Sequence, residues 1–437
     1  MEDGTDSTET ESEGAEYDDS EVRTIALAVI GGLVFGGLAT GVAYPTLPLL
    51  TDVLGISAGM LGVVLSANRF SRLVMNTPAG NVIDRVGTRG PMIAGLFVQA
   101  LAPFGYVVGL HTPAGSVAAP VVGSVSYPGA VFVVARLAWG VGSAFVFLGA
   151  FATVTHVTTS ANRGRWLGYM RAGQSLGFPS GLVVGGLLFN YFGAETAFLA
   201  AGVLALLAGV VAASVLPELH PSAEQRASLR ALPAMIRREP RILPLEVGNM
   251  TLRFVFAGLV MATVASHARS QGMSLAGLGL DAGGLSGVVL AVGVFTSSGT
   301  TLLSGRVSDR LDDRVLVTVP AYLAMAAGLA VIAAVPTLPA LVAGVALVGV
   351  GTGGAGPALL ALVGDITPGD EVGRMGSVYQ VLGDVGLVLG PLLAVPMVES
   401  WLGFATTYVV VAGAVLVTLV VVGASLLRTG VERDPAA

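Results

Sequence analysis

Long runs of apolar residues, each about 20 residues in length, alternate with short polar stretches along almost the whole chain. A helix of that length crosses the hydrocarbon core of a bilayer, which is about 30 Å thick. The runs lack the period-two alternation of barrel strands, and within lipid only helices then satisfy their backbone groups. The pattern predicts an all-α polytopic membrane protein with twelve transmembrane helices, at residues 24–45, 58–80, 91–111, 129–155, 167–189, 196–216, 242–266, 283–305, 314–335, 338–362, 376–397 and 402–427.

The composition agrees with a protein that lies in lipid. Hydrophobic residues make up 54% of the 437 residues and charged residues 11%, whereas a soluble globular protein carries about 25% charged residues. The absence of cysteine excludes disulfides and thiolate metal ligands. The four histidines lack metal-ligand spacing, and the glycine-rich run at 349–356 lacks the Lys-Ser or Lys-Thr pair of a nucleotide loop. We therefore expect no enzyme activity, no cofactor and no metal site.

Basic residues fall on one side of the predicted membrane domain. All 22 are arginines, and the connections after odd-numbered helices hold only Arg269. Because cytoplasmic loops carry the excess of basic residues, the other connections and both termini should face the cytoplasm. We expect a multi-pass protein of the cell (inner or plasma) membrane. The arginines of the connections after even-numbered helices are Arg85, Arg89, Arg163, Arg165, Arg226, Arg230, Arg237, Arg238, Arg241, Arg306, Arg310, Arg314 and Arg374.

Two short patterns occur in both halves of the chain. Gly-x-x-x-Asp-Arg at residues 80–85 recurs at 305–310, and Gly-x-Gly at 140–142 recurs at 349–351. The two patterns recur at different spacings along the chain, and the difference corresponds to the length of a long outer connection. Both repeats therefore fit one duplication of six helices. We expect an acidic disordered cytoplasmic tail, two six-helix bundles joined by a cytoplasmic linker and a second tail, at residues 1–23, 24–216, 217–241, 242–428 and 429–437.

Three stretches of the first half resemble motifs of the major facilitator superfamily. GNVIDRVGTRG at residues 80–90 is similar to the family pattern G-x-x-x-D-R-x-G-x-[RK]-[RK], except that Gly90 stands where a further basic residue is common. RLAWGVGSA at 136–144 resembles R-x-x-x-G-x-G-x-A, and YPTLP at 44–48 resembles the drug-efflux and sugar-efflux branches. The resemblance implies two pseudo-symmetric bundles and a secondary transporter that works by alternating access.

The charged stretch after the second helix also suggests a conformational switch. The resemblance implies that Asp84 lies beside the amino-terminal end of the eleventh helix, near Gly376, where the helix dipole stabilises a carboxylate. Arginines beside it would hold the inner surfaces of the two bundles together. A second interpretation is that the stretch only sets topology and anchors lipid head groups. The predicted switch residues are Gly80, Asp84, Arg85, Gly87, Arg89, Gly305, Asp309 and Arg310.

Ionisable residues within the predicted helices are the candidates for substrate binding and ion coupling. A charge at the centre of a bilayer is unfavourable by at least about 2.5 kcal/mol, so such residues usually have a function. Asp384 is our preferred proton-binding group, and the resemblance implies a role of Arg136 in proton coupling. The predicted coupling and cavity residues are Arg69, Arg72, Arg136, Glu246, Arg253 and Asp384.

These residues also have structural interpretations. Glu246 and Arg253 are seven residues apart on one helix face and could form structural pairs with other helices. Arg69 and Arg72 could clamp helix ends or backbone carbonyls. The aromatic residues Trp139, Phe145, Phe147 and Tyr379 could line a pocket or serve only in packing.

The sequence thus predicts a secondary active transporter, with proton-coupled efflux of a small organic molecule as its function. Sodium in place of protons stays open as the coupling ion. One alternative is a symporter or facilitator that imports a small organic anion, and another is a transport-inactive membrane sensor or scaffold. We expect a monomer whose partners are the small-molecule substrate, protons and the lipid bilayer, without nucleic acid.

Overall fold

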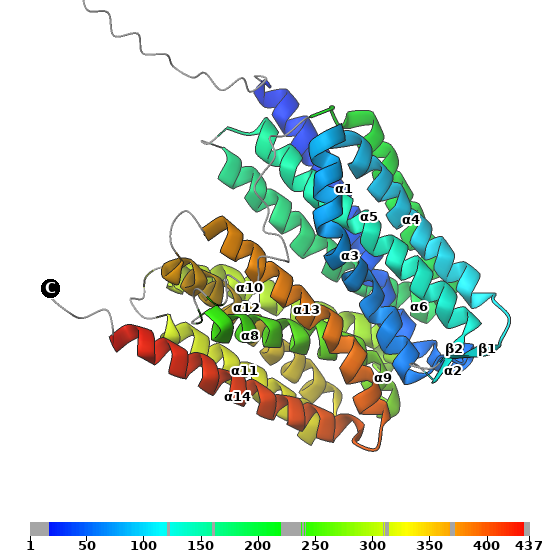
Figure 1. Cartoon of the computed structure of the whole chain (residues 1–437). Coiled ribbons are helices and arrows are strands. Elements are labelled where there is room, and N and C mark those ends of the chain that lie inside the picture. The colour runs from blue at the N-terminus through cyan, green and yellow to red at the C-terminus, as the bar shows by residue number, and fades with distance from the viewer. Residues whose placement is uncertain are drawn as a thin grey trace, which may run out of the picture.

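The structure, a computed structural model, describes residues 17–119, 123–159, 162–219, 237, 240, 242–308, 310, 314–367 and 372–431. The helices form two bundles (Figure 1). The first contains α1 (Asp19–Thr46), the short η1 (Leu47–Leu49) and α2 (Thr51–Leu54), then α3 (Ala58–Val86), α4 (Arg89–Leu110), α5 (Tyr127–Val157) and α6 (Arg163–Val215). The second contains α8 (Ile242–Arg253), the π-helical η3 (Phe254–Val260), α9 (Met261–Ser270), η4 (Ala276–Leu278), α10 (Ala282–Ser308), α11 (Val315–Ala334), α12 (Leu338–Ile366), α13 (Val372–Glu399) and α14 (Gly403–Val431).

Ten segments in the described part of the chain are long and apolar enough to cross a membrane. The α6 segment has 53 residues and would extend about 80 Å at 1.5 Å per residue, but Gly193, with φ of 83°, breaks it into two helices. Helix α3 is 29 residues long, enough for one crossing, and carries charges that lower its hydropathy. If α3 and both parts of α6 are counted, twelve helical segments of the described residues match the twelve predicted spans, and α8, η3 and α9 together form one of them.

Two local features differ from the sequence prediction. The connection predicted between 111 and 129 forms an antiparallel hairpin of β1 (Ser116–Ala119) and β2 (Gly123–Ser126), so the chain is not purely α-helical. The first helix begins at Asp19, because the Asp18 side chain accepts hydrogen bonds from the backbone of Glu21 and Ser20 in a capping box. The same bonds lower the pKa of Asp18. Residues 1–16, most of the predicted linker and residues 432–437 lie outside the described residues.

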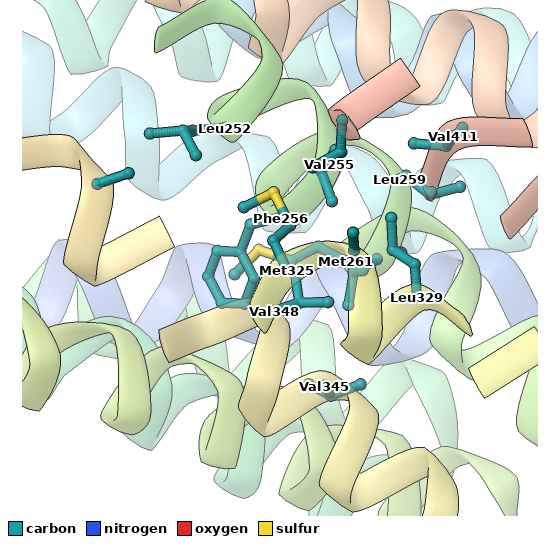
Figure 2. Close-up of a cluster of buried hydrophobic side chains, with 14 of the residues drawn as sticks. Leu252, Val255, Phe256, Leu259, Met261, Met325, Leu329, Val345, Val348 and Val411 are labelled. Carbon is teal, nitrogen blue, oxygen red and sulfur yellow. The ribbon is translucent and has the colours of Figure 1, made fainter. Parts of the chain in front are cut away.

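Buried apolar side chains connect the two bundles as well as filling each of them. Figure 2 shows part of the core of the second bundle, which includes Phe256, Met325 and Val348. Tyr44 and Leu182 of the first bundle belong to the same cluster. The bundles therefore share buried surface, and burial of apolar area is the main stabilising contribution in the parts that face protein rather than lipid.

Hydrogen bonds between the bundles gather at the end that the charge pattern predicts to face outward. Arg269 donates to the Leu49 carbonyl oxygen at 3.1 Å. The Asn190 amide donates to the Gly279 carbonyl at 3.0 Å, and the Tyr191 hydroxyl donates to the Leu278 carbonyl at 2.7 Å. In Figure 1 the bundles approach each other near α2 and α9 and diverge toward the end where the C-terminus lies.

Candidate functional site

A carboxylate of the second bundle lies between two arginines near the middle of the molecule. Asp384, on α13, is 5% exposed. Its Oδ2 lies 3.4 Å from Nη2 of Arg72, which belongs to α3 of the first bundle. Its Oδ1 lies 3.2 Å from Nη1 of Arg253, the last residue of α8. The three side chains form an ion cluster that spans the boundary between the bundles.

The Arg253 guanidinium is oriented by further polar groups. Its Nε donates to the Asn249 side chain at 3.3 Å, and its Nη2 donates to the side-chain oxygen of Gln380. Asn249 in turn donates to the Tyr379 carbonyl at 2.6 Å. Arg253 is also followed directly by the π-helical η3, and π-helical turns often occur at functional sites.

A cavity of about 250 Å³ lies within the first bundle, beside the ion cluster. Residues from α1, α3, α4, α5 and α6 line it, and its charged groups are the guanidinium groups of Arg69 and Arg72. The Arg72 guanidinium lies 5.8 Å from the ring centroid of Phe147. The remaining lining residues are Gly32, Leu33, Gly36, Gly37, Thr40, Asn68, Gln99, Trp139, Ser143, Val146, Phe147, Gln174 and Phe178.

Arg136 is 1% exposed and is not among the residues that line the cavity. Its Nε donates to the Val64 carbonyl at 3.2 Å, and its guanidinium lies 5.4 Å from the centroid of the Tyr44 ring. Arg69 and Arg136 both interact electrostatically with the Tyr44 hydroxyl. Tyr44 thus joins two of the predicted arginines, and the sequence analysis did not select it.

Glu246, on α8, is 1% exposed, and neither carboxylate oxygen has a hydrogen-bond partner among the described residues. It interacts electrostatically with Arg253 and Tyr379. The structure places Glu246 close to the ion cluster but outside its hydrogen bonds, and Arg253 pairs with Asp384 instead.

Uncharged polar residues complete the site, and they are not among the residues predicted from the sequence, because that prediction rests on ionisable groups. They include Asn68, Gln99, Gln174, Asn249 and Gln380. The sequence does contain a signal for these residues. Each has an amide side chain within a predicted membrane helix, where an unsatisfied polar group is unfavourable. Among the aromatic residues that were selected, Trp139 and Phe147 line the cavity, whereas the Tyr379 hydroxyl donates to the Gly356 carbonyl at 3.2 Å.

The predicted switch residues lie at the ends of α3, α4 and α10. Gly87 ends α3 with φ of 85°, Arg85 is exposed, and Arg89 donates to the Ala213 carbonyl of α6 in its own bundle at 3.1 Å. Gly80 is buried, Asp84 and Gly305 are half-buried, Arg310 is exposed, and Asp309 lies outside the described residues.

The described residues contain no group of three or more histidine, aspartate or glutamate side chains that could hold a metal ion. The charged groups of the site are instead arginines that share buried carboxylates, with Asp384 between Arg72 and Arg253. Such an arrangement can bind and release a proton or a charged solute, because protonation of a carboxylate removes its attraction for an arginine.

Known proteins resemble this chain in sequence and in fold. Multidrug resistance protein 2 of Bacillus subtilis is 27% identical over 199 residues, 46% of this chain and 45% of that protein. The chain thus spans about half the length of the first curated relatives that it matches. The multi-drug resistance efflux pump PmrA of Streptococcus pneumoniae is 24% identical over 82% of this chain and 86% of the pump.

Among solved structures, a bacterial homologue of the human lysosomal transporter Spinster, in an inward-facing and occupied conformation, has the same fold. Its TM-score is 0.69 at 14% identity, over 94% of this chain and 96% of that one. The sequence profile of the Major Facilitator Superfamily matches residues 29–301 and 250–436, almost the whole chain. This match shows that the chain belongs to the major facilitator superfamily of membrane transporters.

Proposed function

We propose that the protein exports a small organic molecule from the cell in exchange for protons, by alternating access. We also propose that it lies in the cell membrane with both termini in the cytoplasm. The observation that carries the proposal is the position of Asp384, which pairs with Arg72 of one bundle and Arg253 of the other. In this arrangement the outer ends of the bundles are in contact, so the described conformation corresponds to an inward-facing state.

The ion cluster can couple the binding of a proton to the binding of substrate. Ionised Asp384 holds the Arg72 guanidinium, and Arg72 also lines the cavity. Protonation of Asp384 removes two ion pairs at once, one within the second bundle and one between the bundles. The Arg72 guanidinium then loses its partner, which weakens substrate binding at the cavity wall without abolishing it. Substrate and proton therefore favour different states of the same site, which is the requirement for exchange.

The direction of transport is supported by the relatives. The two curated relatives described above are called a multidrug resistance protein and a multi-drug resistance efflux pump. The cavity of about 250 Å³ suits a small solute, since pockets for drug-sized ligands range from about 300 to 1,000 Å³.

The proposal is tested with proteoliposomes that enclose a pH-sensitive dye and receive a panel of neutral, cationic and anionic solutes. We expect solute-driven proton movement in the natural protein and its loss in Asp384→Asn, while exchange of labelled solute continues, because asparagine binds no proton. Asp365→Asn is the matched control, since Asp365 on α12 pairs at 2.9 Å with Arg314, which directly precedes α11, and neither residue lines the cavity. Solute movement without protons in the natural protein would contradict the proposal.

A second candidate function is import of a small organic anion together with protons. The two arginines that line the cavity, without an acidic residue among the lining residues, favour it. The sign of the dye signal separates the two functions. An external solute that enters with protons acidifies the lumen, whereas one that enters in exchange for protons makes it alkaline.

A further inference from the structure

We propose that the transported molecule is a small organic anion, whose carboxylate binds between Arg69 and Arg72 while its apolar part lies against Trp139, Phe147 and Phe178. The inference rests on the proposed function in one respect, namely that this cavity is the transport site. It holds for either direction of transport.

Positive charge at the cavity exceeds the negative charge that the surrounding helices supply. Asp384 forms ion pairs with Arg72 and Arg253 and also interacts electrostatically with Arg69. Arg69 otherwise interacts with the Tyr44 hydroxyl, which Arg136 shares. Glu246 interacts electrostatically with Arg253 as well, so two carboxylates face the four arginines of the site. A buried cation without a counter-ion is strongly unfavourable, so the cavity favours a solute that brings negative charge.

The two arginines are placed to bind one carboxylate together. Arg69 and Arg72 are three residues apart on α3 and thus on the same helix face, and both line the cavity. Guanidinium groups match the two oxygens of a carboxylate in geometry as well as in charge. The Phe147 ring lies against the Arg72 guanidinium and limits its orientations. The pair resembles a preformed anion site more than a structural clamp.

A buried acceptor in the cavity indicates a second property of the solute. Asn68 is 4% exposed and lines the cavity, and its Oδ1 has no hydrogen-bond partner among the described residues. A hydroxyl or N–H group on the solute would satisfy it, and a site with such a group selects for solutes that donate to it. The structure therefore favours aliphatic or aromatic carboxylates that carry a hydroxyl or N–H donor. An organic cation would meet two arginines and no carboxylate in the cavity wall.

The inference is tested by the thermal stabilisation of the full-length protein in lipid nanodiscs, because a ligand that binds the folded state raises its melting temperature. The probes are small aliphatic and aromatic hydroxycarboxylates, such as 4-hydroxybenzoate, each paired with its primary amide and its primary amine. We expect carboxylates to stabilise the protein, with apparent affinities at least about tenfold higher than those of the amides, since hydrogen bonds to charged groups are stronger than neutral ones.

Variants of the site provide the decisive comparison. Arg69→Gln should remove the preference for carboxylates, and Arg69→Lys, which keeps the charge, should retain part of it. Arg171→Gln is the matched control, because Arg171 is an exposed arginine on α6 outside the cavity. If Arg69→Gln does not fold, Arg72→Gln tests the same pair. Equal binding of carboxylates and amides, no stabilisation by any carboxylate of the panel, or an unchanged preference in folded Arg69→Gln or Arg72→Gln would each overturn the inference.

Failure of this inference is distinguishable from failure of the proposed function. If carboxylates bind with the expected dependence on Arg69 but move no protons in proteoliposomes, the anion site stands and proton-coupled export is wrong. If neutral or cationic solutes drive proton movement through Asp384 and carboxylates do not bind in preference to amides, proton-coupled export stands and the anion site is wrong.

Discussion

The two buried carboxylates of the candidate site, Asp384 and Glu246, have different surroundings. Asp384 contacts two guanidinium groups, whose own side chains are 21% and 25% exposed. Glu246 is 1% exposed and forms no hydrogen bond with any described residue. Removal of a charge therefore has a different consequence at each position, because only Asp384 has ion pairs to lose.

We expect Asp384→Asn to lower the free energy of unfolding by about 1–3 kcal/mol, since two arginines lose their counter-ion but stay partly accessible to water. Glu246→Gln should change it by less than about 1 kcal/mol, because a neutral amide of the same shape is easier to bury than a carboxylate without partners. Thermal unfolding of both variants in the same detergent, followed by tryptophan fluorescence, measures the difference. A larger loss in Glu246→Gln than in Asp384→Asn would contradict this account.

The residues of the site were predictable, but their pairing was not. Arg72 and Asp384 are unusual in membrane helices, and both were selected for that reason from the sequence alone. Their contact joins positions 312 residues apart and depends on how the bundles pack, which no local pattern contains. Tyr44 was missed because a tyrosine within an apolar run is common in packing, and its two arginine neighbours become visible only in the fold.

At the scale of the helices, the contact between α3 and α5 fixes the position of the cavity arginines. A Cβ atom at Gly140, on α5, would overlap the Asn68 carbonyl oxygen and the Ser71 hydroxyl on α3. Both of these residues lie within one helical turn of Arg69 and Arg72. The missing side chain at Gly140 therefore allows the two helices to approach as closely as the site requires.

Gly140→Ala should lower the free energy of unfolding by about 1–3 kcal/mol, because the added methyl group forces α3 and α5 apart. Transport should fall with it, since the cavity arginines move with α3. Gly168→Ala on α6 is the matched control, as nothing lies within 4 Å of a Cβ at that position, and alanine there should leave stability unchanged or raise it by about 0.5–1 kcal/mol. Equal melting temperatures of the two variants would show that the α3–α5 contact tolerates a side chain.

The extents of the helices follow from hydropathy, whereas the breaks within them do not. The predicted span 283–305 corresponds to α10 at 282–308 and the predicted span 338–362 to α12 at 338–366, because an apolar run ends where the backbone reaches polar surroundings. The π-helical turns of η3 lie inside an apolar run and leave its hydropathy unchanged. The hairpin of β1 and β2 depends on pairing within a connection, for which apolar periodicity gives no signal.

At the scale of the whole molecule, a transporter and a scaffold would differ in whether the contacts between the bundles break. The outer ends are held by few hydrogen bonds, including two from the adjacent residues Asn190 and Tyr191 to the segment before α10. A transport cycle requires these hydrogen bonds to break, whereas a scaffold has no need to break them. The shared core near Tyr44 lies at the boundary around which the bundles would rock.

We expect spin labels at the outer pair of positions 192 and 278 to gain a longer-distance population on acidification, while labels at the inner pair of positions 86 and 307 gain a shorter one. The four side chains at these positions are exposed in the structure, so labels should be tolerated. The chain has no native cysteine, so cysteines introduced for labelling react alone. Double electron–electron resonance in nanodiscs measures both distance distributions, and opposite changes at the two ends are the signature of alternating access.

A pair of labels within one bundle, at the exposed positions Val134 and Leu207, serves as the control. Its distance should stay constant if each bundle moves as a rigid body, so a change there would indicate local unfolding and not rocking. In Asp384→Asn the response of the inter-bundle pairs to acidification should disappear, because the group that couples the proton to the bundle contact is absent. Constant distances at both ends of the natural protein, with acid and with solute, would instead identify a transport-inactive scaffold.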